Sequence, residues 1–142
     1  MRRLILFLVC FLLTPSLKSQ TVVSINIDAG INPATAEYIH RGIEKAKKQN
    51  AICLIIHLNT PGGLLKSTRV IVGDIMDSPV PVIVYVSPSG AQAGSAGVFI
   101  TLAAHIAAMA PGTNIGAAHP VDMMGGSKDS VMTEKLKNAA SA

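Results

Sequence analysis

Two hydrophobic periodicities alternate along the chain after residue 19. Short apolar runs of strand length alternate with segments in which apolar residues recur at the spacing of one face of an amphipathic helix. The runs predict strands at Val22–Ile27, Ile52–Leu58, Val80–Val86 and Ile106–Ala110. The other segments predict helices at about 33–48, 64–76 and 94–105, and a further helix from Met132 onward. Strands that alternate with helices in this way predict an α/β fold with a largely parallel sheet.

Local signals define several boundaries. Asn32-Pro33 suits the start of the first helix, because asparagine is a good N-cap and proline fits the first helical position. Tyr38 shares the helical spacing of the apolar positions and is expected on the inner face. The segment 52–58 is apolar almost throughout, as expected of a strand covered on both faces. The small residues of 87–94 predict a turn or loop.

The first 19 residues predict a secretory signal peptide. Arg2 and Arg3 precede the uninterrupted apolar run Leu4–Leu13, and small polar residues follow near an expected cleavage site. The run is shorter than the roughly 20 residues that a membrane-spanning helix needs. An uncleaved anchor or a buried N-terminal helix is the alternative. We therefore divide the chain into a signal peptide, 1–19, and one domain, 20–142.

The distribution of charge argues against a nucleic-acid-binding surface. The chain has 12 Lys and Arg, 8 Asp and Glu and a net charge of +4, but three of the bases lie in the first 19 residues, which hold no acid. The remainder carries nine bases and eight acids, so no basic patch is left to bind phosphates. The four histidines lack the spacing of metal ligands, and no nucleotide-binding loop is present. We expect neither a cofactor nor a metal.

Ser95 is a candidate nucleophile. It lies in Ala93-Gly94-Ser95-Ala96-Gly97 at the start of a predicted helix, where small neighbours let a bulky acyl group approach its hydroxyl. The helix N-terminus and the N–H of Ala96 could stabilise the oxyanion that acyl transfer forms. The structural alternative is that these small residues only let the helix pack closely against the sheet.

Gly62 and Gly63 form a candidate oxyanion-binding turn. They follow Asn59-Thr60-Pro61 at the end of a predicted buried strand, where glycines can adopt positive φ and present N–H groups to a ligand. An ordinary tight turn uses the same residue types.

A serine nucleophile also needs a base to take its proton. The chain offers five candidates: His57, His105, His119, Lys135 and Lys137. We expect His40 on the exposed side of the first helix, and His57 and His105 in structural roles. The spacing of the two lysines is also typical of an exposed helix face.

Three segments are more specific together than any single motif: Asn59–Gly63, Ser87–Gly97 and Gly116–Pro120. They resemble the NfeD-like membrane-bound serine proteases of the Clp protease/crotonase superfamily, and the resemblance covers 20–142. It implies a repeated β-β-α superhelix with a largely parallel sheet. Similar proteins continue with more helices of the protease domain, then membrane helices and a small β-barrel domain. The chain is therefore expected to be an N-terminal protease-domain fragment whose C-terminal helices are truncated.

The resemblance also implies a chemistry. Ser95 matches the nucleophile, and Gly62, Gly63 and the N–H of Ala96 match the oxyanion-binding groups. Archaeal members are described as Ser-Lys proteases that cut hydrophobic segments of stomatin-like membrane proteins, which implies a polypeptide substrate of that kind. An exported, membrane-associated homo-oligomer, with the protease domain on the extracytoplasmic side, is expected on the same basis.

Three residues remain candidates for the base. The resemblance favours Lys135, because Glu-Lys-x-x-Asn is a pattern of bacterial relatives, and Lys137 in the same segment is the alternative. His119 lies 24 residues after Ser95, close to the spacing in Clp proteases, which use a Ser-His-Asp triad. Asp122 would then be a candidate for the orienting acid. A lysine acts as base only if burial or a neighbouring cation lowers its pKa from about 10.4.

Two further functions fit the same sequence. A crotonase-like acyl-thioester enzyme uses the same backbone oxyanion hole but needs no serine nucleophile. A non-catalytic scaffold that binds membrane proteins needs neither. The small residues around Ser95 favour the peptidase.

Overall fold

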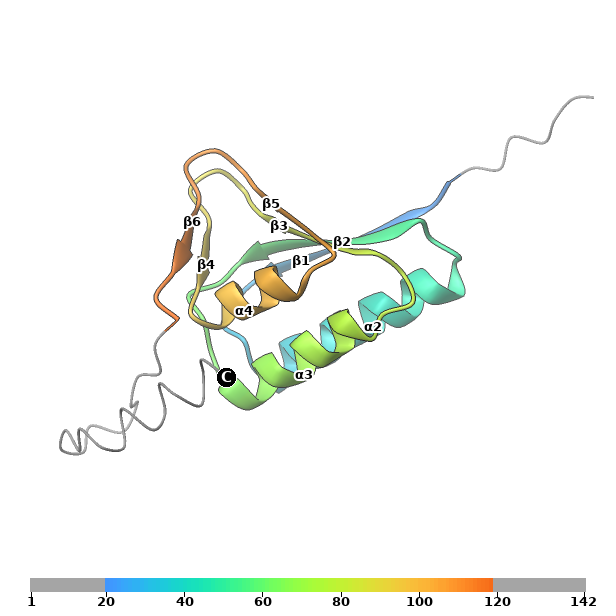
Figure 1. Cartoon of the computed structure of the whole chain (residues 1–142), viewed down its shortest axis with the longest axis horizontal. Coiled ribbons are helices and arrows are strands. Elements are labelled where there is room, and N and C mark those ends of the chain that lie inside the picture. The colour runs from blue at the N-terminus through green and yellow to red at the C-terminus, as the bar shows by residue number, and fades with distance from the viewer. Residues whose placement is uncertain (1–19, 119–142) are drawn as a thin grey trace, which may run out of the picture.

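The computed structural model describes residues 20–118, which form a four-stranded parallel sheet with helices along one face (Figure 1). The elements are β1 (Val22–Asp28), α2 (Pro33–Lys48), β2 (Cys53–Asn59), α3 (Leu65–Met76), β3 (Val82–Val86), β4 (Gln92–Gly94), α4 (Ala96–Ala103), β5 (Ile106–Met109) and β6 (Asn114–Gly116). The predicted signal peptide and the helix predicted from Met132 lie outside the described residues.

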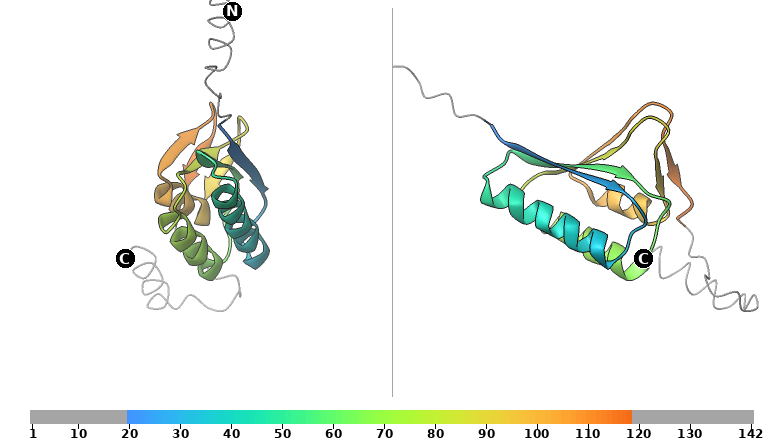
Figure 2. Two further views of the ribbon diagram at one scale, coloured as in Figure 1. Left: turned by 90° about the vertical axis from the view of Figure 1, so that its right-hand side faces the viewer. Right: turned by 180° about the vertical axis from the view of Figure 1, so that it is seen from behind.

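The order of the strands explains why the helices share a face. The main sheet runs β1-β2-β3-β5, so each crossover moves one strand further in the same direction. Right-handed crossovers of this kind place every connecting helix on the same side of the sheet. Figure 2 shows α2, α3 and α4 on that side, and within residues 20–118 no helix covers the other.

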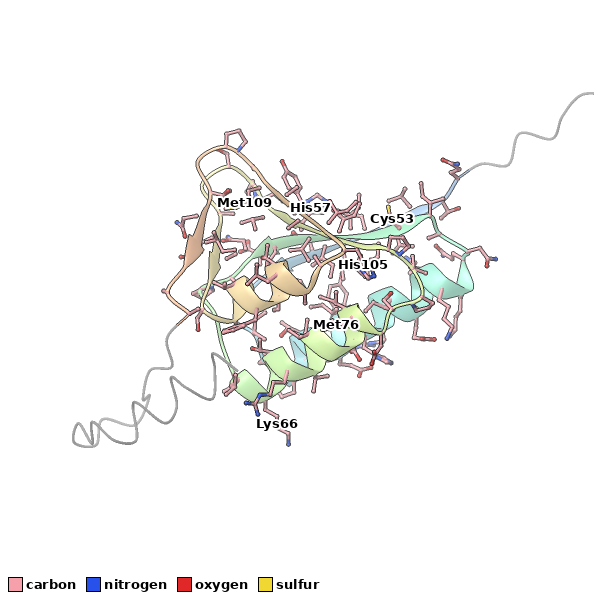
Figure 3. The ribbon with its side chains drawn as sticks, viewed as in Figure 1. Cys53, His57, Lys66, Met76, His105 and Met109 are labelled. Atoms are coloured by element: carbon pink, nitrogen blue, oxygen red, sulfur yellow. The ribbon has the colours of Figure 1, made fainter. Side chains whose placement is uncertain are left out.

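Burial in β2 corrects one expectation. Its residues alternate between buried and half-buried positions, so the described elements cover one face of the strand and leave the other partly open. His57 lies on the open face, away from α2 and α3 (Figure 3). The apolar run predicted that other elements cover both faces of β2. On this face, however, the strand is partly buried by its neighbours β1 and β3, and the sequence of β2 alone does not show that contribution.

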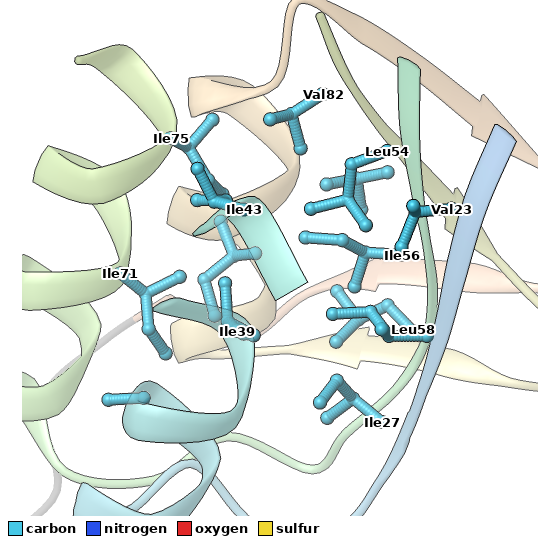
Figure 4. Close-up of a cluster of buried hydrophobic side chains, with 14 of the residues drawn as sticks. Val23, Ile27, Ile39, Ile43, Leu54, Ile56, Leu58, Ile71, Ile75 and Val82 are labelled. Carbon is cyan, nitrogen blue, oxygen red and sulfur yellow. The ribbon is translucent and has the colours of Figure 1, made fainter. Parts of the chain in front are cut away.

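The core lies between the sheet and the two long helices (Figure 4). Fully buried side chains of β2 face isoleucines of α2 and α3 there: Leu54, Ile56, Leu58, Ile39, Ile71 and Ile75. Burying each such side chain contributes about 1.5–3 kcal/mol, so this interface accounts for much of the stability of the described residues.

The start of α2 confirms the predicted cap. The Asn32 side chain accepts hydrogen bonds from the N–H groups of Ala34 and Thr35, and Thr35 Oγ1 accepts one from the Asn32 N–H. Tyr38 was expected on the inner face but is 44% exposed. It precedes Ile39, which is fully buried, and adjacent helical residues point about 100° apart, so Tyr38 falls outside the buried stripe.

The short elements near the end of the sheet differ most from the prediction. The expected loop at 87–94 contains β4, which pairs in parallel with the unpredicted strand β6. The helix expected from Gly94 begins at Ala96, because Gly94 belongs to β4 and pairs with Gly116. In Figure 1 the β4–β6 pair lies at the carboxyl end of β2, beside the start of α4.

Candidate active site

Ser95 lies between β4 and α4, at the N-cap position of the helix. Its φ of 47° and ψ of −105° are unusual for a residue other than glycine. The side chain makes no capping hydrogen bond, and the residue is only half-buried. A serine held in a rarely populated backbone conformation, with its hydroxyl not used in the cap, is a typical feature of a functional site.

Hydrogen bonds on both sides maintain this conformation. The Ser95 N–H donates to the carbonyl oxygen of Gly116 at 2.8 Å, and the N–H of Val98 donates to the Ser95 carbonyl at 3.0 Å. One residue earlier, the Gly94 N–H donates to the Thr60 carbonyl at 2.8 Å. The backbone of Ser95 is therefore held both by the turn after β2 and by β6.

The turn after β2 brings Gly62 into contact with Ser95 and Gly63 into contact with Ile31. A Cβ on Gly62 would lie 2.7 Å from the Cβ of Ser95 and 3.3 Å from its Oγ, so the glycine is in direct contact with the serine. Gly62 also has a φ of 120°, which side-chain-bearing residues rarely adopt. A Cβ on Gly63 would overlap the backbone of Ile31 at 2.1 Å. Both glycines are required by close approach.

The N–H groups of this turn have different partners. The Gly62 N–H donates to Thr60 Oγ1 at 3.1 Å. The Ile31 N–H donates to the Gly62 carbonyl and the Leu64 N–H donates to the Ile31 carbonyl, and these two bonds form a parallel bridge between Ile31 and Gly63. The N–H of Gly63 itself has no acceptor in the described part of the chain. As first residue of α4, Ala96 also has no intrahelical acceptor for its N–H. The turn that contacts Ser95 and the helix that begins after it thus each have one N–H group without an acceptor among the described residues.

The small residues on either side of Ser95, in β4 and α4, also serve packing, which was the alternative interpretation of this segment. A Cβ on Gly97 would lie 2.8 Å from Thr60 Cγ2 and 3.2 Å from the Cβ of Ala93. A Cβ on Gly94 would lie 2.8 Å from the carbonyl oxygen of Pro61. The packing interpretation and the catalytic one therefore apply to the same segment.

The structure adds Thr60 and Gly116 to the candidate site. Thr60 is fully buried and its side chain bonds to Gly62, while Gly116 accepts the N–H of Ser95. Both residues lie in segments that carry the family resemblance, Asn59–Gly63 and Gly116–Pro120, but neither was named as a site residue. No local pattern indicated the hydrogen bond of Gly116 to Ser95, because it depends on the pairing of β4 with β6.

The histidines in the described residues lie apart from the contacts of Ser95. His57 Nδ1 is 3.0 Å from Ser87 Oγ, and its ring packs edge-on against Tyr85 on the open face of the sheet. His105 Nδ1 accepts the N–H of Val82, which fits the structural role expected of it. His40 pairs with Asp74 between α2 and α3, at 3.2 Å. The three candidates that the sequence leaves open for the base are outside the described residues: His119, Lys135 and Lys137.

A protein-family model described as the N-terminal domain of NfeD1b matches residues 21–142. The chain belongs to the NfeD1b N-terminal domain family. This confirms the resemblance that the Pro-Gly-Gly and serine motifs indicated.

Two curated relatives carry membrane-related names. Membrane-bound protease PH1510 of Pyrococcus horikoshii is 43% identical over 123 residues, which are 85% of this chain and 28% of that protein. Membrane protein NfeD1b of Bacillus subtilis is 38% identical over 112 residues, or 79% of this chain and 25% of that protein. The chain thus spans about a quarter of the length of these relatives. Among residues 20–118, no helix is long and apolar enough to cross a bilayer.

Solved structures confirm the fold. Two are mutants of the 1510-N membrane-bound stomatin-specific protease. The first, with a serine replaced by alanine, has a TM-score of 0.74 and 42% identity and covers 80% of this chain and 54% of that one. The second, with a lysine replaced by alanine and a substrate peptide bound, has a TM-score of 0.75 and 38% identity and covers 84% and 57%. ClpP1 from Listeria monocytogenes matches at a TM-score of 0.63 and 21% identity, covering 84% of this chain and 69% of that one, which shows the shared Clp-type fold.

Proposed function

We propose that this chain carries the nucleophile and the oxyanion hole of a serine endopeptidase. The observation that carries the proposal is the direct contact between Ser95 and the Gly62-Gly63 turn, with available N–H groups at Gly63 and Ala96. Serine with two backbone donors is the arrangement that acyl transfer needs. The related solved structures support the same function, because they are named proteases and one of them has a serine replaced by alanine.

The chemistry follows from the roles of these groups. Ser95 Oγ attacks the scissile carbonyl carbon while a base takes the hydroxyl proton, and the tetrahedral oxyanion accepts hydrogen bonds from Gly63 and Ala96. The intermediate collapses with release of the amine, which receives the proton, and water then hydrolyses the acyl-enzyme. Losing one oxyanion donor typically costs about 10²–10³ in rate.

We propose Lys135 as the base, with Lys137 and His119 as the alternatives. The related structure in which a lysine was replaced, and which holds a substrate peptide, supports a lysine. Within residues 20–118, the histidines are engaged with Ser87, Val82 and Asp74. None of these contacts involves Ser95, which also favours a base from beyond residue 118.

The proposed substrate is a hydrophobic segment of a stomatin-like membrane protein. The relatives named stomatin-specific and membrane-bound support this substrate and a membrane-associated location, and the protease domain would lie on the extracytoplasmic side after the predicted signal peptide.

We also propose a homo-oligomer. Apolar side chains exposed along α4 and β5 support association: Leu102 at 75%, Ile106 at 55% and Met109 at 42%. Sedimentation velocity tests it, and a monomer over the whole concentration range would contradict it.

The proposal is tested by labelling the full-length protein with a fluorophosphonate probe, which reacts with activated serines. We expect labelling of the wild type and of Ser24→Ala, which removes an exposed serine on β1, and none of Ser95→Ala. Loss of labelling in Lys135→Ala but not in His119→Ala identifies the Ser-Lys dyad. The reverse result assigns the base to His119, and loss in Lys137→Ala alone assigns it to that lysine.

A folded wild type that does not label contradicts the peptidase. A coenzyme A binding assay on the same sample then tests the acyl-thioester enzyme, which would use the same N–H groups without the serine. Cleavage of a stomatin-derived peptide, absent in Ser95→Ala, tests the substrate class separately. A labelled protein that leaves that peptide intact contradicts only the substrate.

A further inference from the structure

Thr60 is a polar residue with no exposed surface, located between β2 and the Gly62-Gly63 turn. Buried hydroxyl groups are stable only when they are hydrogen-bonded, and Thr60 Oγ1 finds both of its partners on one residue. It accepts the Gly62 N–H at 3.1 Å and lies 3.2 Å from the Gly62 carbonyl oxygen, to which it donates. The hydroxyl therefore closes a small ring around the peptide units of the turn.

The methyl group of Thr60 faces the other half of the site. A Cβ on Gly97 would lie only 2.8 Å from Thr60 Cγ2. Gly97 is in the first turn of α4, the helix that begins after Ser95. The Thr60 backbone also accepts the Gly94 N–H at 2.8 Å and donates to the Gln92 carbonyl at 2.7 Å. Thr60 is thus the residue through which the turn, β4 and α4 are held together.

The hydroxyl also determines which turn N–H is available. Two successive glycines offer two donors, and an oxyanion hole needs one of them aimed at the substrate without reorganisation. Because Thr60 Oγ1 accepts the Gly62 N–H, the Gly63 N–H is the one glycine donor of the turn without an acceptor among the described residues. Without the hydroxyl, the Gly62 N–H would be buried and unpaired, and the turn would have to rotate to satisfy it.

We propose that Thr60 is a positioning residue for the oxyanion hole: its hydroxyl fixes the Gly62 peptide so that the Gly63 N–H faces the carbonyl that Ser95 attacks. This inference rests on the proposed peptidase function. It concerns the transition state rather than substrate binding, so Thr60 affects kcat and not KM.

The test compares Thr60→Val, which keeps the shape and the methyl group, with Thr60→Ser, which keeps the hydroxyl. We expect Thr60→Val to lower the rate of fluorophosphonate labelling and the kcat for peptide cleavage about 10- to 100-fold, at unchanged KM. Thr60→Ser restores most of the rate. Thr68→Val is the matched control, because Thr68 of α3 is also buried but its hydroxyl donates to the carbonyl of Leu64, the N-cap residue of that helix. It loses a buried hydroxyl of the same kind and keeps the wild-type rate.

A measurement on the wild type makes the test independent of whether Thr60→Val folds. By NMR hydrogen exchange, the Gly62 amide should be protected and the Gly63 amide should exchange faster. An unprotected Gly62 amide, or a folded Thr60→Val that labels at the wild-type rate, overturns the role of Thr60 while leaving Ser95 as nucleophile. A wild type that does not label overturns the peptidase, and with it this inference.

Discussion

Replacing Gly97 by alanine should leave the stability of the protein unchanged or lower it, although the same change stabilises most helices. Gly97 is the second residue of α4, two residues after the candidate nucleophile Ser95. Glycine to alanine in a helix normally raises the free energy of unfolding by about 1 kcal/mol, through propensity and the entropy of the unfolded chain. At this position the new Cβ would lie 2.8 Å from Thr60 Cγ2 and 3.2 Å from the Cβ of Ala93.

Neither neighbour can move away easily, because Thr60 and Ala93 are fully buried and form a backbone bridge. Overpacking of this kind costs about 1–3 kcal/mol, which cancels or exceeds the propensity gain. Gly73 in α3 is the matched control: nothing lies within 4 Å of a Cβ placed there, so alanine should gain about 0.5–1 kcal/mol. The two variants should therefore differ by about 1–3 kcal/mol.

Thermal unfolding followed by circular dichroism measures this difference. In a domain of this size, 1 kcal/mol corresponds to a change in Tm of about 4–8 °C. We expect Gly73→Ala to unfold above the wild type and Gly97→Ala at or below it, with slower labelling of Ser95 in Gly97→Ala. If Gly97→Ala raises Tm as much as Gly73→Ala does, the close approach of α4 to Thr60 is refuted.

Three further changes test other parts of the site and fold. Gly62→Ala should abolish labelling of Ser95, since its Cβ would lie 2.7 Å from that of the serine, and a labelled variant would contradict the contact. Asn32→Ala should lower the free energy of unfolding by about 1 kcal/mol in urea titrations, through loss of the α2 cap, and leave labelling intact. Ser95→Gly should be about 1 kcal/mol more stable than Ser95→Ala, because glycine tolerates the φ of 47°, and equal stabilities would argue against backbone strain there.

The long elements were predictable because each has a periodicity of its own. The buried stripe of α2 and the apolar runs of β2 and β3 follow from spacing within single segments, and Asn32 is a local capping signal. The strands β4 and β6 were not predictable in this way. Each has three residues, mostly small, and they exist only because Gln92 pairs with Asn114 across an intervening helix and strand.

The candidate site shows the same division between local and non-local information. Residue type and position made Ser95 and both glycines candidates, since small residues near strand ends are a local pattern, and the family resemblance implied their roles. It did not distinguish the two glycine N–H groups, because that depends on the direction in which the Thr60 hydroxyl points. Nor did it predict a positive φ at Ser95, a residue type with no preference for that region.

The unusual conformation of Ser95 requires both of its neighbouring segments. A residue in a sparsely populated region costs on the order of 1–3 kcal/mol and persists only where surrounding contacts determine it. Here two consecutive N–H groups are held by different partners: that of Gly94 by the Thr60 carbonyl and that of Ser95 by the Gly116 carbonyl, each at 2.8 Å. One bond alone would leave the intervening peptide free to rotate toward an ordinary helical start. The pairing of β4 with β6 therefore does more than extend a sheet, because it supplies the second bond that orients the serine toward the glycine turn.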